Sequence, residues 1–179
     1  MPGSRRLSQR ISEGDGIAVI AQVDDVDGAR AAEAQGAKAL AVSRSIDGIR
    51  QATSLPLLWV GRGDPPDADA ICLRPDDDHT HDHLEPVVDV RDEEELEQAL
   101  EQRDPEIFLL VADEDEDDTD PLDAVLELLP DVPAGKLAIA RVDVASRDEV
   151  LALERAGIDA VLVGDARIAH LVGEQPLDV

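Results

Sequence analysis

The sequence predicts a compact parallel (β/α)8 barrel, the TIM-barrel architecture, within 179 residues. It contains eight short apolar runs, rich in Val, Ile, Leu and Ala and without strict alternation, which is typical of strands buried on both faces. Helical segments separate several of these runs, and this alternation favours a parallel sheet. A pattern shared by residues 36–42, 67–73 and 157–163 indicates a recurring unit. The expected strands are residues 17–23, 39–43, 55–60, 70–73, 86–90, 107–111, 137–140 and 160–163.

The first half of the chain is expected to begin with a short helix over residues 5–13. Asp25 or Asp27 suits the N-cap of the helix after the first strand, because a short acidic side chain accepts hydrogen bonds from the first free backbone N–H groups. Gly36 is expected to end that helix in a left-handed conformation. After the second strand, a short helix is expected over residues 46–53.

Helix signals are clearer in the second half. Asp92 is an expected N-cap, and Pro121 suits the first turn of a helix because its missing N–H has no partner there in any case. Ser146 and Glu149 have the spacing of a capping box, in which each side chain bonds a backbone N–H near the other. The expected helices are residues 92–103, 122–129 and 150–156, with a last helix that starts near Asp165.

Two connections are too short or too irregular for a helix. Residues 61–68 join the third and fourth strands and contain two Gly and two Pro, while residues 74–85 join the fourth and fifth. Eight extended residues still span roughly 26 Å, which is enough to return along a short strand. We therefore expect a barrel without regular helices after strands three and four. Its outer face there would be covered by a second subunit in a homodimer, by an exchanged segment or by the N-terminal helix.

Composition and charge limit the classes of partner. We expect a single domain over residues 1–179, with a leading helix or arm at 1–16 and the barrel at 17–179. A formal net charge of −26 repels nucleic acid and anionic membranes, so neither is an expected partner. No long apolar run or secretory signal is visible, which predicts a cytoplasmic protein. Cys72 and Trp59 are interpreted as core residues.

Four segments resemble the indole-3-glycerol-phosphate synthase family. The most specific are residues 86–100, PVVDVRDEEELEQAL, and 156–168, AGIDAVLVGDARI, which are similar to that family's fifth-strand and last-strand segments. Residues 17–23, IAVIAQV, and 55–58, LPLL, are similar to its first-strand and third-strand segments. The resemblance extends over most of the chain. It implies a (β/α)8 fold and a carbon–carbon lyase of tryptophan biosynthesis.

The same resemblance implies a catalytic set that is mostly absent here. The family's ring closure needs a general-acid Lys, a second Lys and two Glu. The general-acid Lys falls on Val60, which has no proton to donate, and the first-strand Glu and Lys fall on Gln22 and Asp24. Asp89 stands for the fifth-strand Glu and is the only near-match to a catalytic position. The sixth-strand and seventh-strand positions fall near Ala112 and Asp113 and on Arg141, Val142 and Asp143.

Part of a phosphate cradle is expected after the last strand. Gly164 and Ala166 match positions at which the family binds phosphate through backbone amides, and Asp165 matches the family's Glu. Asp143 replaces a glycine of that cradle. Its charge would repel a phosphate about 4 Å away by about 1–4 kcal/mol.

The carboxyl ends of the strands form the mouth, where barrels of this type keep their sites. The expected mouth is acidic, which favours a cation over a phosphate. His79, His81 and His83 follow the fourth strand, and imidazoles beside carboxylates suit a divalent metal, which is the one cofactor considered. The alternative is a solvated loop that replaced a helix. The acidic residues expected at the mouth are Asp24, Asp89, Asp113, Glu114, Asp115, Asp143 and Asp165.

Three hypotheses for the function remain open at this point. The first is a barrel that has lost the lyase reaction and has a binding or structural role, with a small molecule at its mouth. The second is an enzyme of changed, metal-assisted chemistry at an acidic mouth. The third is a residual synthase in tryptophan biosynthesis, which Val60, Gln22 and Asp24 argue against.

Overall fold

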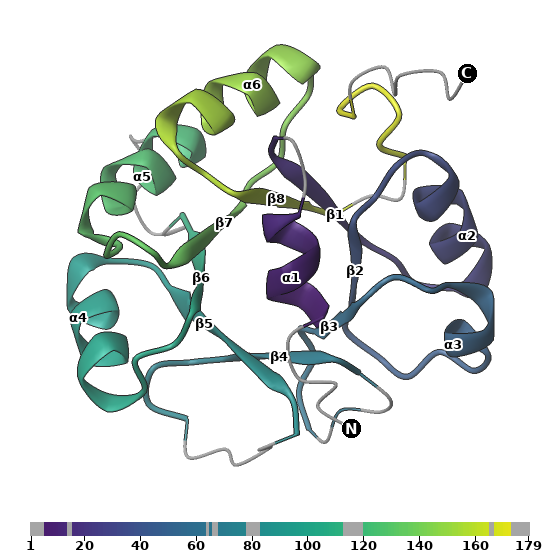
Figure 1. The fold of residues 1–179 in the computed structure, drawn as a ribbon, viewed down its shortest axis with the longest axis horizontal. Coiled ribbons are helices and arrows are strands. Elements are labelled where there is room, and N and C mark those ends of the chain that lie inside the picture. Colours follow the sequence, from purple (N-terminus) through teal and green to yellow (C-terminus); the bar gives the residue numbers. More distant parts are fainter. Residues whose placement is uncertain are drawn as a thin grey trace.

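Eight parallel strands form a closed barrel in sequence order, and β1 pairs with β8 to complete it (Figure 1). The computed structural model describes residues 6–13, 16–63, 65, 68–77, 83–112, 120–164 and 167–172. The predicted (β/α)8 fold is therefore confirmed. The strands are β1 (Ala18–Gln22), β2 (Ala39–Val42), β3 (Leu57–Trp59), β4 (Ala70–Leu73), β5 (Glu85–Val90), β6 (Ile107–Val111), β7 (Leu137–Arg141) and β8 (Ala160–Val163).

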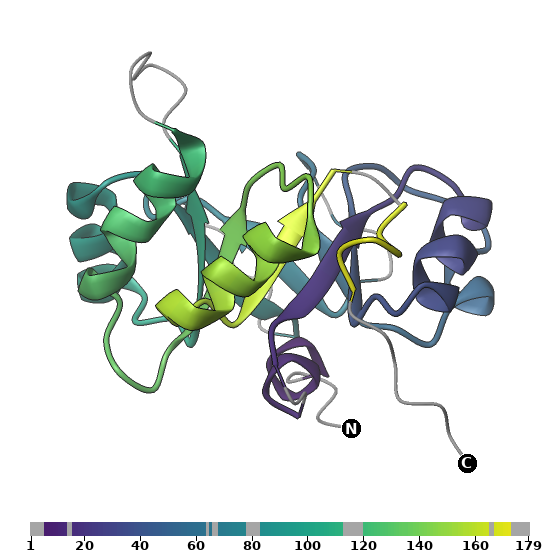
Figure 2. The same ribbon diagram turned by 90° about the horizontal axis from the view of Figure 1, so that it is seen from above.

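In the described part of the chain, helices α2 to α6 surround the barrel and α1 lies beneath it (Figures 1 and 2). No helix of the described residues falls between β3 and β5, as expected from the short connections. Residues 167–172 form a turn in which Leu171 and Val172 donate hydrogen bonds to the Ile168 carbonyl, so the expected last helix is not seen in that stretch. The helices are α1 (Arg6–Ser12), α2 (Val26–Ala34), α3 (Ile49–Ala52), α4 (Glu93–Gln102), α5 (Pro121–Leu128) with a 3-10 turn at Leu129–Asp131, and α6 (Arg147–Ala156).

Helix starts follow the predicted caps. The Asp25 carboxylate accepts a hydrogen bond from the Gly28 amide at 2.6 Å, and Asp92 accepts one from Glu95 at 2.8 Å. Ser146 caps α6 in the same way, and Pro121 is the first residue of α5. Each cap satisfies a backbone donor that has no partner within its helix. Helix α3 is shorter than expected and begins only at Ile49, after Gly48 in a left-handed conformation.

Side chains of the strands alternate between two apolar layers. Ile20, Leu58 and Leu109 belong to a cluster inside the barrel, whereas Val19 and Leu110 belong to a second cluster between the barrel and its helices. Both layers consist almost entirely of aliphatic residues, and Phe108 and Trp59 lie in the outer one. The barrel is therefore a packed core, and its free space lies at the ends of the strands.

The outer face of β3 and β4 is buried although, among the described residues, no helix follows either strand. Trp59, Ile71 and Leu73 are 4%, 3% and 6% exposed within the single chain, and Leu84 of the following connection belongs to the same apolar cluster. The expectation that this face needs a separate cover is therefore not met for these side chains. The homodimer itself stays a prediction. Trp59 packs in the core, as expected.

Helix α1 closes the bottom of the barrel, at the amino ends of the strands (Figure 2). Leu7 and Ile11 are buried in the cluster inside the barrel. The backbone amide and hydroxyl of Ser8 both donate to the buried Glu85 carboxylate at the start of β5. This position corrects one of the expected covers, because α1 lies under the barrel and not over the outer face of β3–β5. None of the described helices is long and apolar enough to span a membrane.

Candidate functional site

The mouth of the barrel holds a pocket of about 790 Å³ at the carboxyl ends of β3, β4, β5 and β7. Its size is within the range of small-molecule sites in proteins. Four arginines and two aspartates contribute to the lining, together with apolar residues. The lining residues are Val60, Gly61, Arg62, Gly63, Ile71, Cys72, Leu73, Arg74, Asp77, Asp89, Arg91 and Arg141.

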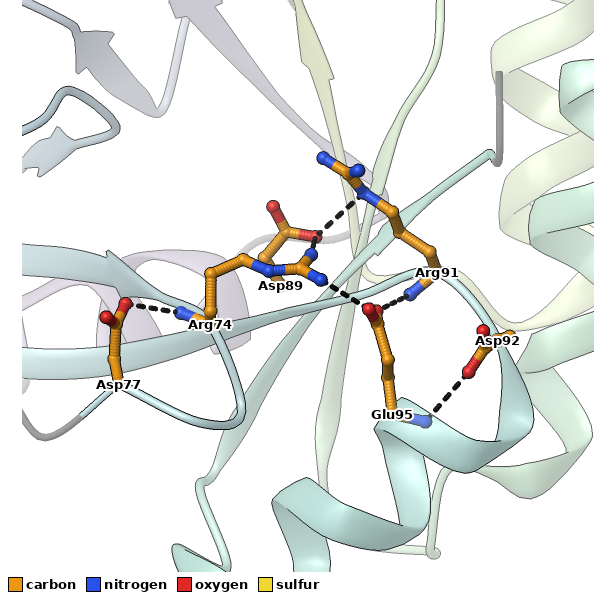
Figure 3. A network of polar contacts seen from close by, with 6 residues as sticks. All are labelled: Arg74, Asp77, Asp89, Arg91, Asp92 and Glu95. Carbon is orange, nitrogen blue, oxygen red and sulfur yellow. Dashed lines mark hydrogen bonds and ion pairs between the residues drawn. The ribbon is translucent and has the colours of Figure 1, made fainter. Parts of the chain in front are cut away.

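Arg74 and two carboxylates form the centre of a polar network on one wall of this pocket (Figure 3). The Arg74 guanidinium lies 3.4 Å from Asp89 through Nη1 and contacts the Glu95 carboxylate through Nη2. Its own backbone amide donates to Asp77 at 2.9 Å. The residue directly after β4 is thus fixed to the end of β5 and to the first turn of α4. The sequence places it there because β4 ends at Leu73, so that Arg74 is the first residue beyond the strand.

Arg91 extends the network from the end of β5. Its backbone amide donates to the second Glu95 oxygen at 2.8 Å, and its Nε lies 4.0 Å from the Asp89 carboxylate. Glu95 in turn is held by the cap of α4, because its amide donates to Asp92 (Figure 3). One glutamate therefore aligns two arginines of the pocket.

Arg141, the last residue of β7, enters the pocket from the other side. Its guanidinium donates to the Gln22 side-chain oxygen at 3.4 Å. This hydrogen bond joins the end of β7 to the end of β1, across the intervening strand β8. Arg141 thus lines the pocket together with residues that follow or belong to β3, β4 and β5.

Burial changes the acidity of two groups in this pocket. Removal from water raises the pKa of the Asp89 carboxyl above its ordinary value, although Arg74 acts in the opposite direction. Burial, with a further contribution from the Asp89 charge, raises the pKa of the Cys72 thiol to about 12. Cys72 faces the inside of the barrel, and its raised pKa keeps it a thiol and not a thiolate at neutral pH.

The two lysines of the chain lie at the other end of the barrel. Lys38 immediately precedes β2, and Lys136 immediately precedes β7, so both are at the amino ends of parallel strands. The Lys136 ammonium pairs with Asp104 at 2.8 Å, which holds it there. The sequence contains no other lysine, so none is available at the mouth.

Comparisons with known proteins give partial similarity to one enzyme. The chain is 36% identical over 80 residues to the indole-3-glycerol phosphate synthases of two strains of Acidithiobacillus ferrooxidans and of Variovorax paradoxus (strain S110). The matched segment covers 45% of this chain but only 30% of the length of those proteins. No family model matches the chain. These findings, together with the barrel, support a synthase-like fold.

The structure brings some of the predicted residues to the mouth. Asp89 is 8% exposed and lines the pocket, as does Val60 at the position that the resemblance gives to the general acid. Gln22 is half-buried at the end of β1, and Asp24 is exposed. Gly164 is exposed at the end of β8 and is not part of the pocket lining.

Several predicted metal and phosphate residues lie outside the described residues. These are His79, His81, Asp165 and Ala166. Asp113, Glu114 and Asp115, expected as acidic residues of the mouth, also lie there. His83 is described and is exposed. Within the described part of the chain, no group of three His, Cys, Asp or Glu side chains is placed to hold a metal ion. The divalent metal therefore stays an untested prediction.

The described lining of the pocket has more arginines than acidic residues, whereas the sequence predicts an acidic mouth. That prediction stays open at Asp113, Glu114, Asp115 and Asp165, which lie outside the described residues. Of the acidic residues expected there, Asp89 lines the pocket, whereas Asp24 and Asp143 are exposed and outside the lining. Of the two aspartates in the lining, Asp89 pairs with Arg74 and Arg91, and Asp77 accepts a hydrogen bond from the Arg74 backbone amide. Sequence reasoning missed Arg74 and Arg91 as site residues, and it named Arg141 only as one of the seventh-strand positions of the resemblance. A signal for all three was present, because each stands at or directly after the end of a strand in a chain with few basic residues.

Proposed function

We propose that this chain is a synthase-like (β/α)8 barrel that has lost the lyase reaction and binds a small molecule at its mouth. The fold and the partial similarity to indole-3-glycerol phosphate synthases support the ancestry. The pocket of about 790 Å³ at the carboxyl ends of the strands supports the binding role. The loss of activity is argued from the placement of lysines.

The observation that carries the proposal is the absence of lysine from the mouth. The resemblance assigns the ring closure a lysine as general acid and a second lysine for proton transfer. Both lysines of this chain precede strands at the bottom of the barrel, and Val60 takes the place of the general acid. A general acid must lie within hydrogen-bond distance of the atom that it protonates. Neither Lys38 nor Lys136 fulfils this requirement at the pocket.

An enzyme of changed chemistry is the second candidate, and one observation favours it. Asp89 is a buried carboxyl with a raised pKa in a pocket, which is the usual setting of a general acid or base. Its ion pair with Arg74 works against this role, because it holds the charged form in place. The binding role therefore ranks first.

The decisive experiment is a turnover assay of the full chain with carboxyphenylamino-deoxyribulose phosphate. Product formation would be followed by indole fluorescence, with the synthase of Acidithiobacillus ferrooxidans as the active control. We expect no product above the level of an enzyme-free sample. Turnover that disappears in the Asp89→Asn variant would contradict the proposal, because it would show that the lyase reaction survives at this mouth. Turnover that persists in that variant and stays with the chain through a further purification step would contradict the proposal as well.

A further inference from the structure

Resting on this proposed binding role, we propose that the mouth pocket takes a small organic anion whose carboxylate or phosphate group is held by Arg91 and Arg141. The site lies on the β4–β5–β7 side of the mouth. It is separate from Gly164, where the family resemblance expects phosphate, because Gly164 does not line the pocket.

The charge distribution is the first argument. The chain carries 42 acidic and 16 basic residues, yet among the described residues four arginines and two aspartates line this pocket. A protein with a net charge of −26 repels free anions over most of its surface. A local concentration of guanidinium groups in a concave site overcomes that repulsion for a ligand that enters it. The same arrangement disfavours a cation.

The second argument is that the arginines of the pocket differ in the contacts that they already make. Arg74 already forms ion pairs with Asp89 and Glu95, so it is a fixed part of the pocket wall. Arg91 approaches Asp89 only through Nε, and Figure 3 shows its two terminal nitrogens without a contact to any other residue drawn. Arg141 donates to the neutral Gln22 amide, and no ion pair involves it within the described residues. The latter two guanidinium groups therefore have charge and N–H donors to offer, whereas the fourth arginine of the lining, Arg62, is an exposed residue of the connection after β3.

The shape of the pocket narrows the ligand class. A guanidinium presents two parallel N–H donors that match the two oxygens of a carboxylate or phosphate. Val60 and Cys72 give the same pocket an apolar wall beside these donors. Asp77 and Asp89 would repel a ligand that is anionic throughout. The fitting ligand is a small organic acid with one anionic group at the arginines and a hydrocarbon part against the apolar wall.

The test uses isothermal titration calorimetry on the full chain with two probes, sodium butyrate for the carboxylate and inorganic phosphate for the phosphate. We expect saturable binding of at least one probe, and the tighter probe identifies the anionic group. Arg141→Gln and Arg91→Gln should each weaken that binding about tenfold or more, because each removes charge-assisted hydrogen bonds. Arg155→Gln is the matched control, since Arg155 is exposed on α6 and its loss changes the net charge equally.

Three results would overturn the inference. These are the absence of saturable binding for both probes, equal weakening in the Arg155→Gln control, and binding that is lost in Gly164→Asp but kept in Arg141→Gln. Far-ultraviolet circular dichroism of each variant checks that it is folded, and Arg91 and Arg141 give two independent variants. A failure of the anion-binding test would not change the interpretation of the lyase assay. Turnover in that assay would overturn the proposed function while leaving the anion site standing.

Discussion

Arg74, the residue after β4, forms an ion pair with Asp89 near the end of β5, with 3.4 Å between Nη1 and Oδ1 (Figure 3). The second Nη group reaches Glu95 in the first turn of α4. In a barrel with a helix after every strand, that helix would fix the end of β4. Here a three-residue polar network does so, and the same network forms one wall of the pocket.

Replacing Arg74 with glutamine should destabilise the fold. The Asp89 side chain is 11% exposed and would lose its charged partner, and Glu95 would lose the same one. Leaving a buried acceptor without its donor costs about 1–3 kcal/mol. The free energy of unfolding, measured by urea denaturation, should fall by this amount.

Arg30→Gln is the control for that variant. Arg30 faces Asp27 at 3.9 Å on the exposed side of α2. Exposed pairs of this kind contribute less than about 1 kcal/mol, and many contribute nothing measurable. Equal effects of the two substitutions would contradict the structural role of Arg74.

The pH dependence of stability should carry a signature of Asp89. Burial raises the pKa of this carboxyl in the folded chain above the ordinary value of 3.8, so the folded state holds the proton more tightly than the unfolded state. Its contribution to the free energy of unfolding must then fall as pH rises from below the ordinary value through the raised one, and stay constant above it. The free energy of unfolding of the wild type, minus that of Asp89→Asn, should therefore decrease as pH rises across that window. Urea denaturation at a series of pH values measures it, and a difference that grows with pH would show that Arg74 dominates over burial.

Local chemistry made much of the fold predictable. Asp92 accepts from the amide three residues later, and Ser146 and Glu149 act within one helical turn, so each signal is contained in a few adjacent residues. The strands are equally legible, because burial on both faces demands continuous apolar runs. Their expected ends lie within two residues of the observed ones.

The site could not be predicted in the same way, because its contacts join residues that are distant in the sequence. Arg74 meets Glu95 across 21 positions, and Arg141 meets Gln22 across 119. These pairs exist only once the barrel has closed. A count of acidic residues after the strands predicted a negative mouth, but it did not show which side chains face the pocket. The position of α1 beneath the barrel depends on the same closure.

Gly61 should be intolerant of substitution. A Cβ at this position would lie 2.2 Å from the Ser43 carbonyl oxygen and 2.8 Å from its carbon, so the clash is with backbone. Forcing an extra methyl group into a packed site costs about 1–3 kcal/mol, and this contact falls at the upper end. Gly61→Ala should lower the thermal midpoint, whereas Gly164→Ala should not, because nothing lies within 4 Å of its Cβ. Similar thermal midpoints for both variants would contradict the close approach of Gly61, after β3, to Ser43, after β2.

The Cys72 thiol should react slowly with thiol reagents in the folded protein. With a pKa of about 12, only about one molecule in ten thousand carries a thiolate at pH 8, compared with a sizeable fraction for an ordinary cysteine. Labelling with 5,5′-dithiobis(2-nitrobenzoic acid) should therefore be at least about 100-fold slower in the native state than in urea. Because the chain has one cysteine, the denatured sample is its own control. Rapid native labelling would place Cys72 in a more polar setting than the pocket wall.

Removal of the Ser8 hydroxyl should loosen the base of the barrel. The Glu85 carboxylate is 4% exposed and accepts hydrogen bonds from both the amide and the hydroxyl of Ser8, so Ser8→Ala leaves one carboxylate oxygen without this donor. The expected cost is about 1–3 kcal/mol. Leu7→Ala should cost about 2–5 kcal/mol, because it opens a cavity inside the barrel. Ser12→Ala is the matched control, since Ser12 is an exposed residue whose hydroxyl donates to the Ser8 carbonyl, and its loss should stay within about 0.5 kcal/mol. Urea midpoints decide the matter: if Ser8→Ala and Ser12→Ala unfold together, α1 does not close the barrel through Glu85.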